Sequence, residues 1–212
     1  QNWKCMESAV IHDGILRHVV VANDFGSVTG GASRVAIGSA LGLAARGLPV
    51  TYFSAVPPVD ARLGQASGLD VVCLDQPDIL ADRNRLRAAW RGLWNREAAA
   101  AMRAVLRGLD PAHTVVHFHA FTKAMTASTI RAALDAGFQA CLTLHDYFIA
   151  CPNGGLYDYR QARVCLRRPM SAACLLANCD ARRRAHKLWR SLRQAIQNAA
   201  LAGQNRLHYL FT

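Results

Sequence analysis

Short apolar runs rich in β-branched residues alternate with helix-length segments along the chain, and this alternation restricts the fold more than any other feature. The expected strands are 17–23, 49–55, 70–74, 114–119, 139–144 and 207–211. The expected helices are 32–46, 80–109, 122–136 and about 180–202. Strands that alternate with helices in this way indicate an α/β protein, in which helices cover both faces of a parallel sheet. We therefore expect one continuous α/β unit, since no flexible linker or internal repeat divides the chain.

The segment 80–109 predicts an amphipathic helix or a broken pair of helices. Its apolar residues recur at spacings of three and four and are interleaved with arginines. They are Leu86, Trp90, Leu93, Trp94, Met102, Val105 and Leu106. Because such periodicity normally reports burial, we expect this stripe to pack in the core rather than to contact a membrane or a partner.

A glycine-containing loop, 24–31, joins the first strand to the first helix, and Gly47 is expected to end that helix. Backbone N–H groups at a helix N-terminus behind glycines can bind a phosphate. Gly26, Gly30 and Gly31 match neither the dinucleotide fingerprint nor the P-loop. A tight turn without a ligand explains this loop equally well.

Three histidines follow neighbouring strands. His117 and His119 alternate at the end of one strand, and His145 comes directly after the next, followed by Asp146. The carboxyl ends of parallel strands meet at one edge of the sheet, where α/β proteins bind ligands. A histidine there can serve as an acid, a base or a phosphate partner. We favour a structural role for His117 and a functional role for His145. His119 by itself is also best explained as structural.

Four cysteines follow His145 within one loop-rich segment, at C-x13-C-x8-C-x4-C spacing: Cys151, Cys165, Cys174 and Cys179. Four thiolates could hold a structural zinc ion, or less favourably an iron–sulfur cluster. Buried free thiols or oxidised pairs are the alternatives. The first residues contain no secretory signal, so a reducing compartment is expected and a disulfide framework is disfavoured. The other cysteines, Cys5, Cys73 and Cys141, are expected to be core or incidental thiols.

The formal net charge is +11 and the pI is near 9.9. Such a charge permits an anionic partner, either nucleic acid, an acidic membrane surface or a phosphate-bearing substrate. Much of the excess lies in 83–107 and 182–193. Solvated helix faces are the favoured explanation for most of it. No run is apolar and long enough to span a bilayer.

The sequence begins at Gln1 and ends at Thr212, directly after the apolar run 207–211. A strand pattern that stops without a turn or cap leads us to expect that the chain is cut at both ends and that more protein follows it.

Three segments together resemble the N-terminal half of retaining, family 4-type bacterial glycosyltransferases, which have the two-domain GT-B architecture. Residues 29–35, TGGASRV, resemble that family's GGAERV stretch, with Ser33 where glutamate is common. Residues 115–119, VVHFH, resemble its HVH strand end. Residues 142–147, LTLHDY, and the cysteines after them resemble a bacterial subgroup with a cysteine-containing insert. The resemblance covers roughly 17–212.

The resemblance implies a Rossmann-like, acceptor-side domain over 1–212, with 151–179 as the insert and with the C-terminal donor-binding domain absent. In such enzymes the loop containing Gly30 and Gly31 approaches the phosphates of a UDP- or GDP-sugar donor, assisted here by His119. His145 would lie at the reaction centre. The partners would be a saccharide or lipid-linked acceptor and the donor domain of the same protein. A cytoplasmic enzyme, peripheral on the inner face of the membrane, would suit the basic helices, and this piece alone would be inactive.

Two other functions remain open. A metal-stapled basic module could bind nucleic acid or another polyanion, although nucleic acid is the less favoured partner. A nucleotide-using enzyme of another kind could also be built on the same fold, because a fold does not determine a function.

Overall fold

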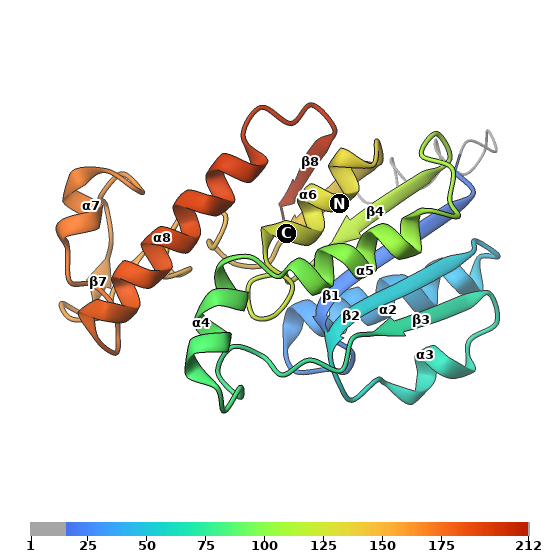
Figure 1. Ribbon diagram of the computed structural model, residues 1–212, viewed down its shortest axis with the longest axis horizontal. Coiled ribbons are helices and arrows are strands. Elements are labelled where there is room, and N and C mark those ends of the chain that lie inside the picture. The colour runs from blue at the N-terminus through green and yellow to red at the C-terminus, as the bar shows by residue number, and fades with distance from the viewer. Residues whose placement is uncertain (1–15, 212) are drawn as a thin grey trace.

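The computed structural model describes residues 16–211, and within them a six-stranded parallel sheet forms the centre of the molecule (Figure 1). Its strands are β1 (His18–Phe25), β2 (Val50–Val56), β3 (Leu69–Cys73), β4 (Thr114–Phe118), β5 (Gln139–Leu144) and β8 (Leu207–Phe211). They lie in the order β3-β2-β1-β4-β5-β8. All five neighbouring pairs are parallel, so every carboxyl end lies at the same edge. The predicted Rossmann-like α/β class is confirmed.

Strand β1 shows how the two faces of the sheet divide. Val19 and Val21 pack in one apolar cluster with helices α2 (Gly31–Ala45) and α3 (Ala61–Gln65). Val20 and Ala22 pack in the other, with helices α5 (Arg96–Leu106) and α6 (Ala127–Asp135). Successive strand residues point to opposite faces, so a continuous run of apolar residues is needed where both faces are covered. The uninterrupted valines of β1 follow from this requirement.

The strand order reverses between β1 and β4. From β1 the chain builds outward to β2 and β3, and from β4 it builds in the other direction to β5 and β8. In open parallel sheets this reversal opens a crevice at the carboxyl edge, where ligands bind. The loops after β1 and β4 flank that crevice.

The segment after β5 forms a separate lobe at one end of the molecule (Figure 1). It contains a two-stranded hairpin, β6 (Tyr157–Asp158) and β7 (Arg163–Val164), and helix α7 (Ala172–Leu176). Helix α8 (Arg184–Leu201) then runs from the lobe back to the sheet, where it contacts α6. Helix α4 (Arg85–Leu93) also contacts α8.

Several sequence-based expectations need correction. The segment 80–109 is a broken pair, α4 and α5, as anticipated, because Asn84 and Asn95 each cap a new helix with their side chains. The apolar stripe is buried on α5, but Leu86 and Trp90 on α4 are 77% and 74% exposed. Helix α8 starts at Arg184, later than the expected start near residue 180, and Arg183 makes no side-chain cap.

Gly47 does end α2, with a φ of 81°, as expected for a left-handed residue after a helix. The short elements α3, β6, β7 and α7 were missed, since two to five residues show no periodicity. Cys5 and both ends of the chain lie outside the described residues. Within 16–211, no helix has the length and apolar character needed to cross a membrane.

Asp24 links the end of β1 to the loop after β4, at the point where the strand order reverses. Its side chain is buried, and its carboxylate accepts hydrogen bonds from the backbone N–H groups of Lys123, Ala124 and Met125 at 2.8–2.9 Å. The neighbouring Asn23 accepts one from the N–H of Ala120 at 3.2 Å. Two consecutive residues at the end of β1 therefore fix the loop that follows β4.

Replacement of Asp24 by alanine should lower the free energy of unfolding by about 3 kcal/mol, because two buried N–H groups and one partly buried N–H group lose their acceptor, and each buried group costs about 1–3 kcal/mol. Asp24→Asn keeps one acceptor oxygen and should cost less. Urea titration measures both changes. Asp70→Ala, at an exposed carboxylate on β3, is the matched control and should change stability by less than about 0.5 kcal/mol. Equal stability of Asp24→Ala and wild type would contradict this role.

Candidate functional site

The residues singled out from the sequence come together at the carboxyl edge of three adjacent strands. The glycine loop follows β1, His119 follows β4 and His145 follows β5. The parallel register places them at the same edge without any contribution from the surrounding loops. This edge flanks the crevice where the strand order reverses.

The three histidines form a contiguous group. His119 Nδ1 lies 3.0 Å from His145 Nε2, so one ring donates a hydrogen bond to the other. The rings of His117 and His119 lie 4.2 Å apart between centroids. His117 Nε2 is 2.7 Å from the Thr143 hydroxyl on β5. His119 is 3% exposed and its Nε2 has no hydrogen-bond partner within the described residues.

Burial keeps this group uncharged. It lowers the pKa of His117 to about 4, with His145 adding to the effect, and that of His119 to about 2, with His117 and His145 adding to it. The pKa of His145 is also lowered by burial, but Asp146 opposes the shift. His145 is the more accessible of the hydrogen-bonded pair. It can hydrogen-bond to a ligand, while His119 contacts it as a neutral ring.

The glycine loop presents an open helix N-terminus. Gly30 is the N-cap residue of α2, and it makes no side-chain cap because it has no side chain. Gly30 and Gly31 are exposed, and a Cβ built on either would meet nothing within 4 Å. Helix α2 has 15 residues and no acidic residue in its first turn. Its free N–H groups and its positive dipole end suit an anion.

Ser33, where the resembling family often has glutamate, is buried one turn into α2. Its hydroxyl lies 3.0 Å from the Thr29 hydroxyl, so it holds the glycine loop against the helix. Gly26 lies where a Cβ would come within 2.9 Å of the Pro58 carbonyl oxygen, which explains the glycine there as a packing requirement.

Helix α8 braces the segment that follows His145. Gln194 and Gln197 donate side-chain hydrogen bonds to the carbonyls of Ile149 and Phe148, both at 3.0 Å. Arg193 donates to the Thr122 carbonyl at 3.0 Å, and its guanidinium lies 5.0 Å from the Phe148 ring. Burial, followed by Arg190, lowers the pKa of Arg193 to about 10, so its charge persists at neutral pH. This buried arginine was not anticipated, because α8 reads from sequence as a solvated basic helix.

The four cysteines of the lobe do not form the expected metal centre. Within residues 16–211, no group of three or more His, Cys, Asp or Glu side chains is arranged to hold a metal ion. Instead, the buried Lys187 ammonium lies 3.6 Å from Cys174 Sγ and 3.4 Å from Cys179 Sγ. Cys165 Sγ lies 3.8 Å from a guanidinium nitrogen of Arg167, and Cys151 is buried. Neither zinc nor an iron–sulfur cluster is supported by this arrangement.

Cys73 and Cys141 are half-buried free thiols on β3 and β5, which agrees with the incidental role expected for them. Burial raises the pKa of Cys141. A thiol of that kind is protonated and unreactive at neutral pH.

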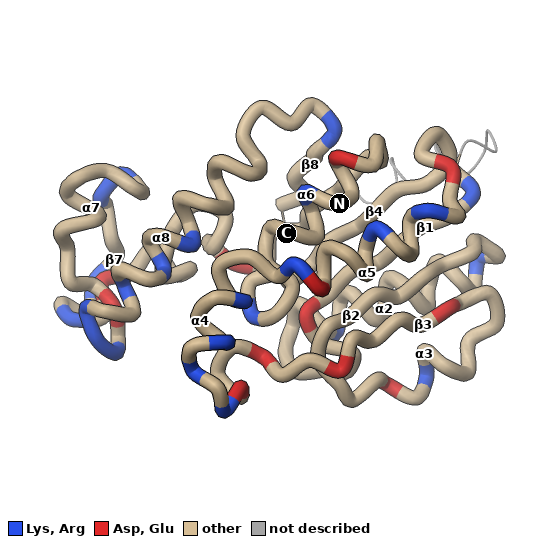
Figure 2. Tube along the Cα trace, viewed as in Figure 1, with Lys and Arg blue, Asp and Glu red and all other residues tan. Residues whose placement is uncertain are grey.

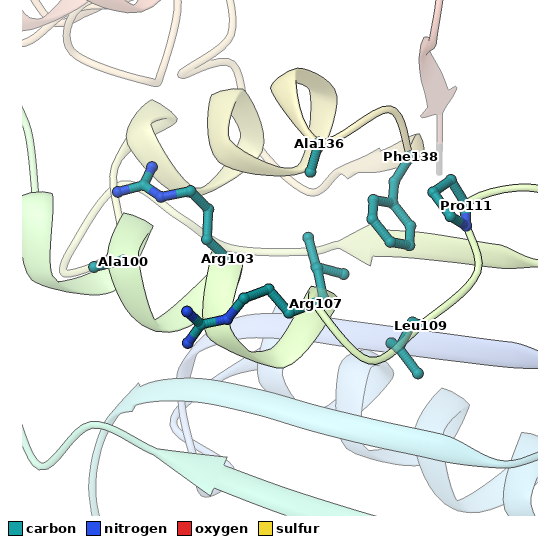
Figure 3. A pocket seen from close by; sticks show the side chains of 8 residues that line it. Ala100, Arg103, Arg107, Leu109, Pro111, Ala136 and Phe138 are labelled. Atoms are coloured by element: carbon teal, nitrogen blue, oxygen red, sulfur yellow. The ribbon is translucent and has the colours of Figure 1, made fainter.

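Two hollows differ in their chemistry. The larger, of about 610 Å³, lies between α5 and α6 near the amino edge of the sheet, where Arg103, Arg107 and Phe138 line it (Figure 3). It lacks any histidine, acid or hydroxyl among its lining residues. The smaller, of about 20 Å³, lies at the carboxyl edge and is lined by His119, Thr122, Thr143, His145 and Asp146 among others. The convergent polar groups mark the smaller one as the candidate site.

The fold and this edge together define a doubly wound α/β domain with an anion-suited helix N-terminus and a histidine pair beside its crevice. No family model matches the chain, and no curated protein gives a significant match. Among solved structures, the chain is similar to the crystal structure of LpCGTa in complex with UDP, with a TM-score of 0.44 and 13% sequence identity. The match covers 93% of this chain and 53% of that one, so the chain spans about half of its length.

The neutral histidine group predicts a dependence of stability on pH. His117 is uncharged in the folded state down to about pH 4 but takes up a proton near pH 6.5 when unfolded. The unfolded state therefore gains protons first, and stability falls as the pH drops from about 6.5 toward 4. Each such histidine contributes about 1.4 kcal/mol per pH unit. His117→Gln should reduce the slope of unfolding free energy against pH by about that amount.

Urea unfolding at pH 7, 6 and 5 measures the slope. Thr143→Val is the matched control, because it removes the hydrogen-bond partner of His117 but keeps the titrating ring, and it should retain the wild-type slope. An identical slope in His117→Gln and wild type would show that the ring takes up its proton over the same pH range in the folded and unfolded states.

Proposed function

We propose that this chain is the acceptor-side domain of a retaining glycosyltransferase, which moves a sugar from a nucleotide-sugar to a saccharide or lipid-linked acceptor. The observation that supports this best is spatial. The glycine loop, His119 and His145 are far apart in the sequence and were singled out there as three family-like segments, and they meet at one edge of the sheet.

The glycine loop would receive the phosphate charge of the donor. Gly30 and Gly31 leave the first N–H groups of α2 open, and the absence of an acid in the first turn of this helix leaves its positive end uncompensated. When the bond between the sugar and the nucleotide breaks, negative charge develops on the departing phosphate. Fixed N–H groups stabilise such charge without having to reorganise.

His145 would polarise or orient a group at the reaction centre. Its ring lines the small hollow, and its hydrogen-bond partner His119 directly precedes the loop that Asp24 holds. The hydrogen bond between the two rings fixes the orientation of His145. A neutral imidazole that accepts a hydrogen bond from His119 at Nε2 can donate one from Nδ1 to a sugar or phosphate oxygen.

The donor, a UDP- or GDP-sugar, would be held chiefly by a second domain of the same protein. Residues 1–212 would form the acceptor side, with 151–179 as a structural insert, and transfer would require both parts. The retaining stereochemistry and the acceptor class rest on the resemblance of the three segments and are part of the proposal.

A different nucleotide-using enzyme on the same fold is the second candidate, since the open N-terminus of α2 suits any phosphate. The complete protein that carries this domain should be supplied with a panel of nucleotide-sugars and free nucleotides. Turnover of a nucleoside triphosphate without turnover of any nucleotide-sugar would favour the second candidate.

His145→Ala in the complete protein should lower the rate of sugar transfer by about 10²–10³-fold, the usual contribution of a hydrogen-bond donor fixed at the reaction centre. Chromatographic detection of the released nucleoside diphosphate measures the rate. The control is His186→Gln, at an exposed position on α8, which should retain wild-type activity. An unchanged rate in His145→Ala would remove this residue from the reaction centre.

The anion-binding role of the glycine loop can be tested by charge alone. Gly30 has an extended φ of 172° and open space around it, so asparagine and aspartate both fit and both can cap α2. Gly30→Asp should weaken donor binding about tenfold relative to Gly30→Asn, because the carboxylate repels the phosphates. Calorimetric titration with the nucleoside diphosphate provides the comparison. Equal affinities would exclude phosphate from this helix end.

A further inference from the structure

The lobe that follows His145 concentrates the charge of the chain. Residues 151–193, here called the basic lobe, carry ten Lys or Arg residues and two acids, a net charge of +8 out of +11 for the whole sequence. Figure 2 shows these basic positions gathered around β7, α7 and the first half of α8, at the end of the molecule. One-fifth of the chain therefore carries most of its net positive charge.

The acids of the lobe do not offset its outward charge, because both are buried and paired internally. Asp158 accepts a hydrogen bond from Arg167 at 3.0 Å, and Asp180 lies 3.0 Å from Arg190. The remaining basic side chains divide into buried and exposed sets. Lys187 and Arg193 are buried, and the exposed arginines are Arg160, Arg163, Arg168, Arg182, Arg183 and Arg184. The outer surface of the lobe thus presents arginines without carboxylates between them.

Large apolar side chains are also exposed on the basic lobe. On the segment that contains β7, Val164 is 66% exposed and Leu166 is 93% exposed, with Arg163 and Arg168 on either side. Leu176 on α7 is 72% exposed, and Leu188 and Leu192 on α8 are 57% and 51% exposed. Exposed leucines cost hydration free energy, and a protein surface that interleaves them with arginines is typical of binding at a lipid interface.

We infer that the basic lobe docks on a bilayer containing anionic lipids, with its arginines at the phosphate level and Val164, Leu166 and Leu176 in the outer acyl region. Charge complementarity selects this occupant. A second copy of the chain would bring two positive lobes together, and their repulsion would oppose association. Single-stranded nucleic acid is bound through stacking aromatic residues, whereas the exposed apolar side chains of the lobe are aliphatic except for Tyr159.

The lobe is connected to the candidate site, so docking of the lobe would also affect that site. The lobe begins six residues after His145 and is fastened by α8 to the segments that flank the small hollow. A bilayer bound to the lobe would be connected to the candidate site through α8 and could supply it with a lipid-linked acceptor. This consequence rests on the proposed function, but the docking itself does not.

Vesicle sedimentation tests the inference with the purified protein and no sugar substrate. The protein should sediment with vesicles of phosphatidylcholine and phosphatidylglycerol, should not sediment with phosphatidylcholine alone, and should be released by high salt in part. Two sets of variants probe the surface: Arg163→Gln/Arg168→Gln/Arg183→Gln/Arg184→Gln and Leu166→Ser/Leu176→Ser. Each set should weaken binding by about tenfold or more.

Arg103→Gln/Arg107→Gln removes two basic residues from α5 and its end, at the opposite edge of the sheet, and is the matched control. It should bind vesicles like wild type, and circular dichroism confirms that all variants fold. Binding that is equal for both vesicle types, that the control weakens as much as the lobe variants do, or that is absent would overturn the inference. Binding of polyuridine but not of vesicles would assign the surface to nucleic acid instead.

The vesicle assay and the transfer assay separate the two proposals. Loss of vesicle binding with sugar transfer to a water-soluble acceptor intact would leave the proposed function standing and isolate the lobe as the membrane contact. Vesicle binding by a protein that turns over no nucleotide-sugar would support the docking surface and contradict the glycosyltransferase proposal.

Discussion

The carboxylate of Asp24 is the interaction on which the arrangement of the site depends. Three backbone N–H groups of the loop after β4 converge on it, so the position of that loop is determined by the end of β1. Burial raises the pKa of this carboxyl, and the three hydrogen bonds act in the opposite direction. Burial of the carboxylate is unfavourable by itself, but no other side chain of this size can accept hydrogen bonds from three adjacent backbone N–H groups. His119 lies directly before the loop so fixed.

Helix α8 also supports the site, because several of its polar side chains are buried against the neighbouring segments. Arg193, Gln194 and Gln197 are buried and hold the backbone on both sides of the small hollow. The opposite side of the same helix bears Leu188 and Leu192, exposed beside the arginines of the basic lobe. Helix α8 therefore inverts the usual amphipathic arrangement, and this inversion links the candidate site to the surface that we assign to the membrane.

Most of the sheet could be predicted from the sequence because buried parallel strands need largely apolar runs, and β1 and β5 provide them. The sheet in turn predicts that His119 and His145 meet. The lobe was less predictable, because its short elements lack periodicity. Its cysteines suggested a metal site, but the Lys187 ammonium contacts two of the four sulfurs. Periodicity predicted that Trp90 lies in the core, but this side chain is exposed. Periodicity shows that one face of a helix is apolar and does not show which element covers that face.

The hydrogen bond between His119 and His145 couples the tautomers of the two rings. If His119 Nδ1 carries the proton, His145 must present a lone pair at Nε2 and its proton at Nδ1. If His145 Nε2 carries it, the proton of His119 moves to the buried Nε2, which has no acceptor within the described residues. The first state is favoured, because an unpaired buried N–H is costly. In this state the lone pair of His145 is taken by His119, so the ring presents its Nδ1–H to a ligand as a hydrogen-bond donor.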